Sequence, residues 1–247
     1  YSKKRAMSQT HVEDIYDSYI DRLREANEVT RYAGRSEWFH ASSSGLCTRK
    51  IYFQSIENAE PSPRDKDSLR LFRLGDLVHT DIQTAVTEYA RETGARVLIE
   101  KEIVLPKLGV RGFLDLALLD DSHLIDIKTC NSYKWKNMFG KNASANTSNN
   151  YALQLGTYGM FIDQNYEHLK KLSLLFYNKN TSQMREVEFS RSIMLDAEIY
   201  WHDVNEKFDD GLPPIRLGEA PAYGWECNPK YCSFFEHCGG GLKPELL

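Results

Sequence analysis

The sequence predicts an α/β domain in which a central mixed sheet is flanked by helices. Three apolar runs of strand character follow one another at residues 96–105, 110–119 and 123–129. Two further runs of this kind, 172–177 and 184–189, lie beyond a helical segment. Helical periodicity before, between and after the runs supplies the flanking layers. With 247 residues, 41% of them hydrophobic, the chain is long enough for one such domain.

The first helical segments precede the strands. Thr10 with Glu13 forms a capping box, and apolar residues then recur at helical spacing. A shorter helix is expected within residues 42–54, entered through a serine-rich turn. A loop rich in proline and charge follows at 57–67.

The longest helix is expected from residue 68 to about 91. Its amphipathic stripe consists of Leu71, Leu74, Val78, Ile82, Ala85 and Tyr89. His79 lies beside this stripe. Later helices are predicted at 151–163 and 190–208. The apolar side of the last helix consists of Ile193, Ala197, Tyr200, Trp201, Val204 and Phe208.

The three central runs are expected to form an antiparallel meander. The second and third are joined across the short turn Asp120-Asp121-Ser122, which is typical of a tight connection between antiparallel strands. The polar stretch from 141 to 150 is predicted to be a mobile loop.

Two carboxylates and a lysine lie near the ends of adjacent predicted strands. The run Gly112-Phe113-Leu114-Asp115 places one carboxylate on the second strand, and Asp126-Ile127-Lys128 lies in the third. Side chains two apart on a strand share a face, so Asp126 and Lys128 point to one side and Ile127 into the core. A lone D-x-K triplet is usually surface charge. Here a second carboxylate lies on the neighbouring strand, and like charges brought together are costly without a cation.

This pattern favours a site for a divalent cation. Mg²⁺ and Mn²⁺ prefer hard oxygen ligands, which Asp115, Asp126 and the main-chain carbonyl of Ile127 supply. His79 adds a nitrogen ligand from the long helix. A cation there can activate water and stabilise charge on a phosphate. Lys128 is then placed to orient or deprotonate the water, or to stabilise the developing charge.

From about residue 42 to 238 the chain resembles the RecB-type nucleases of the PD-(D/E)XK superfamily. Their site consists of a helical histidine, an Asp after a Gly-x-x motif, an acidic-x-Lys strand and a Gln-x-x-x-Tyr helix. The matching residues here are His79, Asp115, Asp126 with Lys128, and Gln154 with Tyr158. Gln154 and Tyr158 are four apart and share a helix face. The resemblance implies a restriction-endonuclease-like core and catalytic roles for Asp115, Asp126, Lys128, Gln154 and Tyr158.

Four of the five cysteines divide into one before the strands and three near the end: Cys47, then Cys227, Cys232 and Cys238. In a reducing compartment such a set more often binds a metal than forms disulfides. The fifth, Cys130, is expected to be a buried small apolar residue.

An iron-sulfur branch of the same family has this one-plus-three division of its cysteines. The branch includes the AddB nuclease domain and the CRISPR-associated adaptation nucleases. The resemblance therefore implies a 4Fe-4S cluster on the four cysteines. The branch usually ends in C-x2-C-x5-C, whereas this chain has C-x4-C-x5-C. Zinc on four thiolates is the alternative.

A cluster bound in this way would join the two ends of the chain and restrict its unfolded state. We expect one nuclease domain over residues 1–247, with a core at 68–208. Residues 42–54 and 211–240 are expected to form a cap around the cluster.

Charge and hydropathy limit the function classes. A formal net charge of -4 argues against a protein that coats nucleic acid, but not against an enzyme that carries carboxylates. No apolar run reaches the roughly 18 to 20 residues of a membrane helix, and the start lacks the apolar segment of a signal peptide. We expect a cytoplasmic protein without membrane contact. No phosphate-binding G-x-x-x-x-G-K-[ST] loop is present, so unwinding of DNA has to come from a helicase or recombination partner.

The resemblance implies a Mg²⁺- or Mn²⁺-dependent exonuclease for single-stranded DNA or DNA ends, with a role in replication, recombination or repair. Aromatic residues beside basic ones, such as Tyr133 and Trp135, are candidates for base stacking or for packing. One alternative is a structure-selective or DNA-processing endonuclease. Another is a non-catalytic, cluster-containing DNA-binding subunit, against which the intact Asp115, Asp126 and Lys128 weigh.

Overall fold

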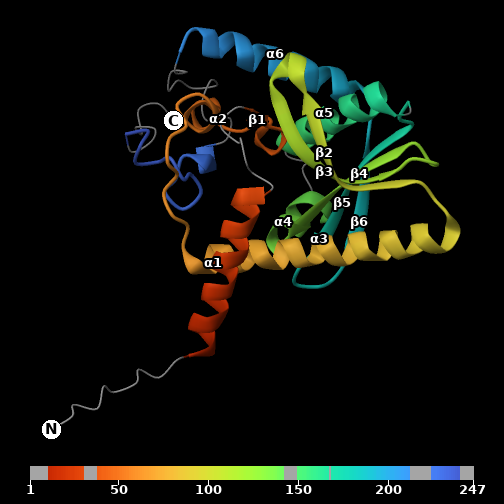
Figure 1. Ribbon diagram of the computed structural model, residues 1–247, viewed down its shortest axis with the longest axis horizontal. Coiled ribbons are helices and arrows are strands. Elements are labelled where there is room, and N and C mark those ends of the chain that lie inside the picture. The colour runs from red at the N-terminus through yellow and green to blue at the C-terminus, as the bar shows by residue number, and fades with distance from the viewer. Residues whose placement is uncertain (1–10, 31–37, 142–148, 167, 212–223, 240–247) are drawn as a thin grey trace.

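A six-stranded mixed sheet with helices on both faces forms the centre of the computed structural model (Figure 1). The structure describes residues 11–30, 38–141, 149–166, 168–211 and 224–239. The predicted class, an α/β fold with a mixed sheet flanked by helices, is confirmed. Most of the predicted loop at 141–150 and the segment 212–223 of the predicted cap lie outside the described residues.

The central strands form the expected antiparallel meander. Strand β2 (Val97–Leu105) pairs with β3 (Val110–Leu118), which pairs with β4 (His123–Cys130). The 3-10 turn η3 (Pro106–Leu108) connects the first two. Strand β5 (Lys171–Asn178) runs parallel to β4, and β6 (Met184–Phe189) is antiparallel to β5. The parallel pair makes the sheet mixed.

Strand β1 (Phe39–His40), which the sequence analysis missed, pairs in parallel with the start of β3. The sheet order along this path is β1-β3-β4-β5-β6. Strand β4 pairs with the end of β3, from Leu116 to Leu118, whereas β1 pairs at Val110 and Arg111. The middle of β3, which contains Gly112 and Asp115, therefore faces a gap between β1 and β4.

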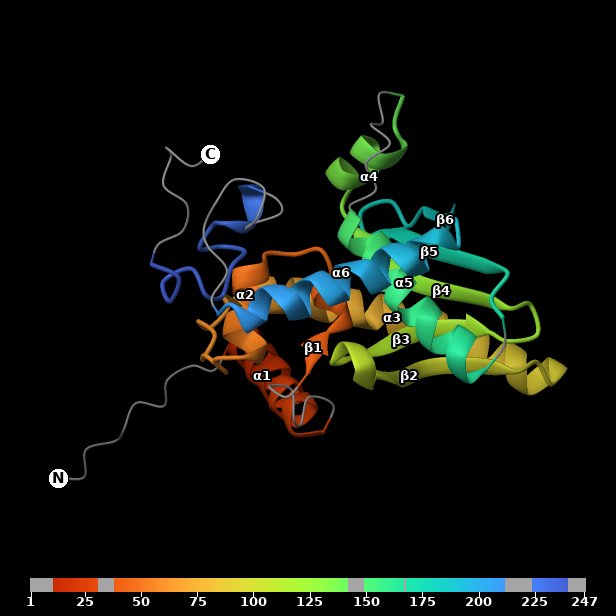
Figure 2. The ribbon, with the colours of Figure 1, turned by 90° about the horizontal axis from the view of Figure 1, so that it is seen from above.

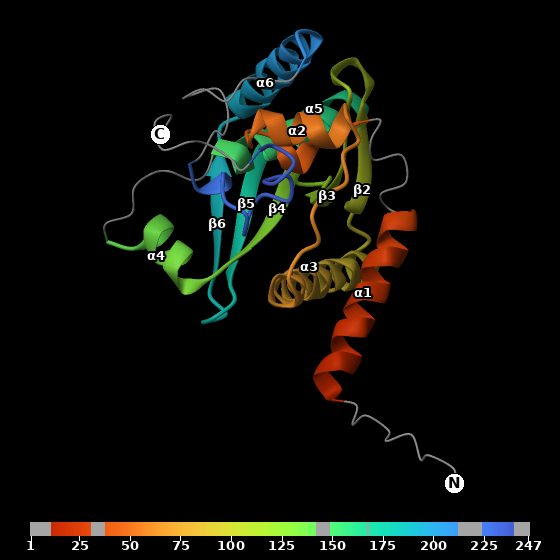
Figure 3. The same ribbon diagram turned by 90° about the vertical axis from the view of Figure 1, so that its left-hand side faces the viewer.

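Helices α5 (Asn149–Asn165) and α6 (Ser192–Asp209) cover one face of the sheet (Figures 1 and 3). Helix α5 is apolar almost all round, as expected of a helix packed between the sheet and a second helix. The predicted apolar side of α6 is confirmed, with Ile193, Ala197, Trp201 and Val204 buried. The Trp201 indole is stacked on Phe39 at 5.8 Å and donates to the Thr157 hydroxyl at 2.9 Å.

Helix α3 (Lys66–Thr93) lies on the opposite face of the sheet (Figure 3). Its N-cap Asp65 accepts a hydrogen bond from Ser68 N, and Gly94, with φ 77°, ends it in the left-handed conformation. The helix is where it was predicted, but its amphipathic stripe does not form a core face. Leu71, Leu74 and Tyr89 are exposed, and Gln83 is the buried residue of the helix.

Helix α1 (Val12–Thr30) packs across α3 through ion pairs. Asp17 is buried and accepts from the Arg70 guanidinium at 2.8 Å, and Lys66 lies 3.1 Å from the same carboxylate. Among the apolar positions of α1 whose burial is described, Ile20 is buried, while Val12 and Ile15 are exposed. Charge rather than apolar burial thus anchors this helix.

Helix α2 (Thr48–Ser55), which follows the 3-10 turn η2 (Ala41–Ser43), packs against the last described segment of the chain. Residues 224–239, which begin with the turn η4 (Gly224–Glu226), lie against this helix (Figure 2). Phe53 contacts the rings of Phe234 and His237, and Ser62 N donates to Ser233 O at 2.7 Å. None of the described helices has both the length and the apolar character needed to cross a membrane.

Candidate active site

The predicted carboxylates lie where strands β3 and β4 separate. The ladder between them ends at the pair Leu116 and Ile125, one residue short of Asp115 and Asp126. Beyond this point Ile127 N donates to Asp115 Oδ2 at 2.7 Å, so a carboxylate replaces the missing strand partner. We call the place where β3 and β4 separate, beside Asp115 and Asp126, the fork. The N–H and C=O of one strand residue point to the same edge of the strand, so the Ile127 carbonyl also faces the fork.

Asp115 is ionised in this setting. Its side chain is only 12% exposed, and His79 Nδ1 lies 3.5 Å from Oδ1. Burial raises the pKa of Asp115, but the hydrogen bond from His79 and the charges of His79 and Lys128 outweigh burial, so this pKa is lowered. The same contact raises the pKa of His79 against the effect of its own burial.

Asp126 has the opposite character. Its side chain is 1% exposed, and burial together with the nearby Asp115 charge raises its pKa to about 6. Lys128 Nζ lies 2.7 Å from Oδ2, an ion-pair distance, yet no hydrogen bond of acceptable angle reaches this oxygen. A buried carboxylate oxygen without a directed donor is costly. The site thus offers a cation an oxygen that the protein itself leaves poorly satisfied.

Lys128 remains an ammonium. Burial lowers its pKa, but the charges of Asp126 and Asp115 outweigh this, and the pKa is raised. Nζ also donates to Gln154 Oε1 at 2.9 Å. The geometry therefore favours orientation and charge stabilisation over proton abstraction by Lys128.

Helix α5 holds the lysine from the opposite side. Gln154 Nε2 donates to the Tyr158 hydroxyl at 2.9 Å, which fixes the amide so that its oxygen faces Lys128. A Cβ on Gly112 would lie 2.8 Å from the Ala41 Cβ and 3.1 Å from the Tyr158 ring. Gly112 therefore allows Tyr158 to lie directly against β3. The residues of the predicted set, on α3, β3, β4 and α5, are all brought together.

Gln83 and Glu100 are members of this neighbourhood that the sequence analysis missed. Gln83 lies one turn after His79, and its Nε2 donates to the Asp115 carbonyl oxygen at 3.2 Å and to Glu100 at 2.7 Å. Glu100 has φ 49° in the middle of β2, opposite Asp115. The signal in the sequence was a glutamine at i+4 from His79, on the same helix face.

Tyr151 and Lys134 were missed as well. The Lys128 ammonium lies 5.0 Å from the centroid of the Tyr151 ring, and Lys134 Nζ donates to the Tyr151 hydroxyl at 2.6 Å. Lys134 belongs to α4 (Ser132–Phe139), on which Tyr133 is 75% exposed. Trp135 packs against the core and contacts Phe139 at 4.8 Å, so packing is its role.

The donor set at the fork fits a divalent cation. It comprises two buried carboxylates, a main-chain carbonyl that faces them and an imidazole already in contact with one of them, which are ligands that Mg²⁺ and Mn²⁺ accept. Within the described ranges no three His, Cys, Asp or Glu side chains are already spaced to hold a metal ion. Binding would therefore require small side-chain shifts, such as release of His79 from Asp115.

Cation affinity at this fork should fall as the pH falls below about 6. Asp126 has a raised pKa of about 6, so below that pH the free site holds a proton that a cation must displace. One displaced proton corresponds to about a tenfold loss of affinity per pH unit. Calorimetric titration with Mn²⁺ at pH 5, 6, 7 and 8 measures this. The affinity should rise from pH 5 to pH 8, because His79, whose pKa is also raised, must lose its proton to bind a cation. Equal affinity at pH 5 and 8 would contradict the assignment.

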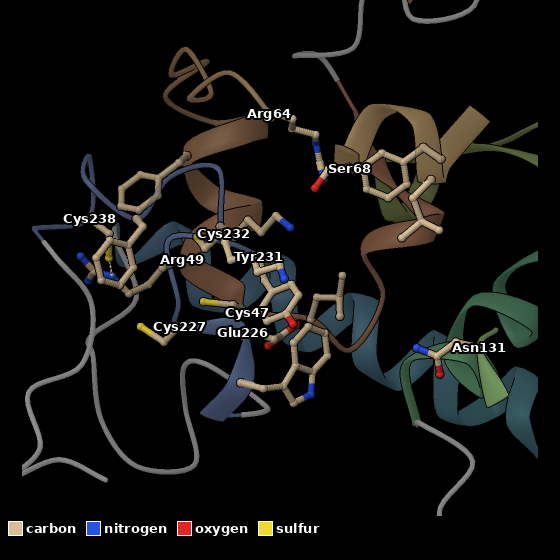
Figure 4. A pocket seen from close by; sticks show the side chains of 18 residues that line it. Cys47, Arg49, Arg64, Ser68, Asn131, Glu226, Cys227, Tyr231, Cys232 and Cys238 are labelled. Carbon is tan, nitrogen blue, oxygen red and sulfur yellow. Dashed lines mark hydrogen bonds between the residues drawn. The ribbon is translucent and has the colours of Figure 1, made fainter. Parts of the chain in front are cut away.

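The four outer cysteines line one cavity of about 540 Å³, and none of them is in a disulfide (Figure 4). Cys47 comes from the entry to α2, whereas Cys227, Cys232 and Cys238 come from the last described segment. Arg49 Nε donates to Cys238 Sγ at 3.2 Å. Burial raises the pKa of Cys47 to about 11 and also raises that of Cys232. Cys130 is buried on β4, as expected, and does not line this cavity.

The chemistry of this donor set suits a soft metal centre, although the described thiols are not already spaced to hold a metal ion. Cys47 and the three late cysteines line the same cavity, and thiolates are the ligands of iron-sulfur clusters and of structural zinc. The positions alone do not separate the two metals, because both accept four thiolates.

No protein-family model matches this sequence, and no curated protein matches it. Solved structures do. The chain is similar to the crystal structure of SSO0001, with a TM-score of 0.52 and 18% sequence identity over 84% of this chain and 88% of that one. The two proteins share a fold.

Two further matches are structures of one enzyme, the alkaline exonuclease LHK-Exo from Laribacter hongkongensis. The first has a TM-score of 0.48 and 14% identity over 73% of this chain and 92% of that one. The second, a complex with dAMP, has a TM-score of 0.44 and 16% identity over 71% and 93%. Identities this low do not transfer the role of any residue.

Proposed function

We propose that this chain is a divalent-metal-dependent deoxyribonuclease of the RecB type, with Asp115, Asp126 and Lys128 as its catalytic residues. The observation that carries the proposal is the fork itself. Two buried carboxylates meet there beside an ammonium, and one carboxylate oxygen lacks a directed donor. Gln154, Tyr158 and His79, the other residues of the family pattern, touch members of this set.

Asp115, Asp126, the Ile127 carbonyl and His79 would hold Mg²⁺ or Mn²⁺. When bound, the cation would supply an activated water and charge stabilisation on the phosphate. The Asp126 carboxylate must be ionised for this, which its pKa of about 6 permits at neutral pH.

Hydrolysis joins a water oxygen to phosphorus and breaks the bond from phosphorus to one sugar oxygen, which takes up a proton. Negative charge on the phosphate oxygens grows along this path. Lys128 stays protonated, so its ammonium can donate to one of these oxygens. Gln154 and Tyr158 are positioning residues, because they hold the ammonium in place and keep its direction fixed.

His79 and Gln83 play the corresponding part for the other carboxylate. His79 contacts Asp115 Oδ1, and Gln83 holds the Asp115 main chain from the same helix face. Together they fix Asp115 at the point where the strand ladder no longer does.

The proposed substrate is DNA with a free end or in a single strand, and the proposed mode is exonucleolytic. A structure-selective or processing endonuclease would use the same residues.

In our proposal the four cysteines hold a 4Fe-4S cluster that joins α2 to the last described segment as a structural element. A helicase or recombination partner supplies the unwound strand.

The two nuclease modes differ in their need for an end. Linear single strands should be degraded to short products, while covalently closed circles of the same sequence should survive, because an exonuclease attacks from a terminus. The assay compares initial rates on both substrates with Mg²⁺ or Mn²⁺, and the same circle linearised by one cut serves as the matched control. Comparable rates on circle and linear strand would establish the endonuclease instead.

A further inference from the structure

The cavity lined by the four outer cysteines has a second wall that the cysteines do not explain. One wall is the segment that carries Cys227, Cys232 and Cys238 with α2, and the other is the loop before α3 and the first turns of that helix. Figure 4 shows Arg64 and Ser68 across the cavity from Cys47 and Tyr231, with Asn131 at one end. We infer that the part of this cavity away from the thiols is a binding path for single-stranded DNA. The inference rests on the proposed function and names where its substrate lies.

Aromatic rings line both walls and remain exposed. Phe72 on α3 is 48% exposed, and Trp225 and Tyr231 on the opposite wall are 58% and 50% exposed. Trp225 and Tyr231 meet edge to face with their centroids 5.7 Å apart. Large rings left open on two sides of one cavity are suited to stack on unpaired bases.

Each wall pairs its ring with a cation. The Arg64 guanidinium lies 4.7 Å from the Phe72 centroid, and Lys230 Nζ lies 5.8 Å from that of Tyr231. Both basic residues are exposed and can face phosphates. Arg49 and Lys50 also line the cavity, but they lie beside the thiols. Arg49 donates to Cys238, and the charge of Lys50 opposes the burial that raises the pKa of Cys232.

The charge of this cavity departs from that of the chain. The whole protein has a net charge of -4, yet even without Arg49 and Lys50 the lining contains two basic side chains, Arg64 and Lys230, and one acid, Glu226, which is buried. Basic side chains interleaved with aromatic rings are typical of grooves that track a single strand. A duplex covers the faces of its bases by stacking, so it would not use the exposed rings.

The cavity also leads to the fork. Its lining includes Asn131, which directly follows β4 and lies three residues beyond Lys128, or roughly 10 Å away if the chain stays extended. On α3, Phe72 precedes His79 by seven residues, again roughly 10 Å at the rise of a helix. Both walls thus continue into the candidate active site, and a strand held in the cavity would have its next phosphates beside it.

The test measures binding without cleavage. Fluorescence anisotropy of labelled oligothymidylate, in buffer without divalent cation, compares the full chain with the double variant Trp225→Ala/Tyr231→Ala. Loss of stacking should weaken binding about tenfold for each ring. Tyr89→Ala, an equally exposed tyrosine at the far end of α3, is the matched control and should bind normally.

A second pair of variants tests the cations and the opposite wall. Arg64→Ala lies outside the cysteine segment, so its result does not depend on the folding of that segment. Arg64→Ala with Lys230→Ala should reduce the slope of log affinity against log salt by about 1.4, or about 0.7 for each phosphate contact. Lys101→Ala, an exposed lysine on β2, should leave the slope unchanged.

Three results would contradict the inferred binding path for single-stranded DNA. The aromatic and Arg64 variants could bind within twofold of the parent chain, a duplex could compete as well as the strand, or a mononucleotide could compete as well as the oligomer. Failure of the proposed function would look different: the parent chain would bind the strand in this cavity but would not cleave it with Mg²⁺ or Mn²⁺.

Discussion

Asp126→Asn and Lys128→Ala should each reduce the rate of DNA cleavage by about 10²- to 10⁴-fold. Loss of one positioned catalytic group typically lowers the rate of an enzyme by this factor. Asp126 contributes the carboxylate oxygen that no directed donor satisfies, and Lys128 contributes the ammonium beside it. The measurement is the initial rate on an end-labelled single strand at saturating Mg²⁺ or Mn²⁺.

Asp120→Asn is the matched control for these variants. Asp120, in the turn between β3 and β4, is half-exposed and paired with Arg96, so its loss should leave the rate unchanged. Circular dichroism and strand binding without metal should be close to those of the parent chain for all three variants. Near-normal turnover of either site variant would remove that residue from the catalytic set.

Cys232→Ser should remove the metal centre and lower the thermal stability of the protein. A centre held by Cys47 and the last three cysteines closes most of the chain into one loop, and a link of that span is worth on the order of 4 kcal/mol or more in chain entropy alone. Protein purified without oxygen should be brown and contain about four irons per chain. Iron analysis and a melting curve measure both effects.

Cys130→Ala is the control for this change, because Cys130 is free but lies on β4, away from the cavity. It should keep its iron and lose less stability than Cys232→Ser. Stoichiometric zinc in colourless protein prepared in the same way would replace the cluster with a zinc site. Full iron content in Cys232→Ser would remove Cys232 from the ligand set.

Strand and helix positions could be predicted wherever one face of an element is buried. The α6 pattern of Ile193, Ala197, Trp201 and Val204 matches the residues that are buried. Helix α3 was also placed correctly, but its apolar period did not show what would cover the stripe. In the structure the sheet contacts α3 near His79 and Gln83, and Leu71 and Leu74 remain exposed. The spacing of apolar residues predicts which kind of element forms, but it does not show which parts of the protein pack against that element.

The site could be predicted in its members but not in its geometry. The D-x-K triplet and Asp115 placed the carboxylates on adjacent strands. The ladder between β3 and β4 ends one residue before them, and nothing in the sequence marks this point. The two-residue strand β1, which pairs with the start of β3, is also too short to have a pattern. Gln83 and Glu100 were missed for a related reason, since their contact with β3 arises from the crossing of α3 over the sheet.

The opposed pKa shifts at the fork likewise depend on tertiary contacts. Two aspartates on adjacent strands look equivalent in sequence. Burial raises the pKa of Asp126 to about 6, whereas His79 and Ile127 N help to lower that of Asp115. Only the folded contacts make the two carboxylates different.

The central claim is that the fork at Asp115, Asp126 and Lys128 is a metal-dependent nuclease site, and an assay of the parent chain on end-labelled single-stranded DNA tests it most directly. With Mg²⁺ or Mn²⁺ the strand should be cut to short products. With excess chelator, or with Asp126→Asn and metal, it should stay intact. Cleavage that persists in Asp126→Asn, or a parent chain that leaves every strand intact with either cation, would contradict the claim.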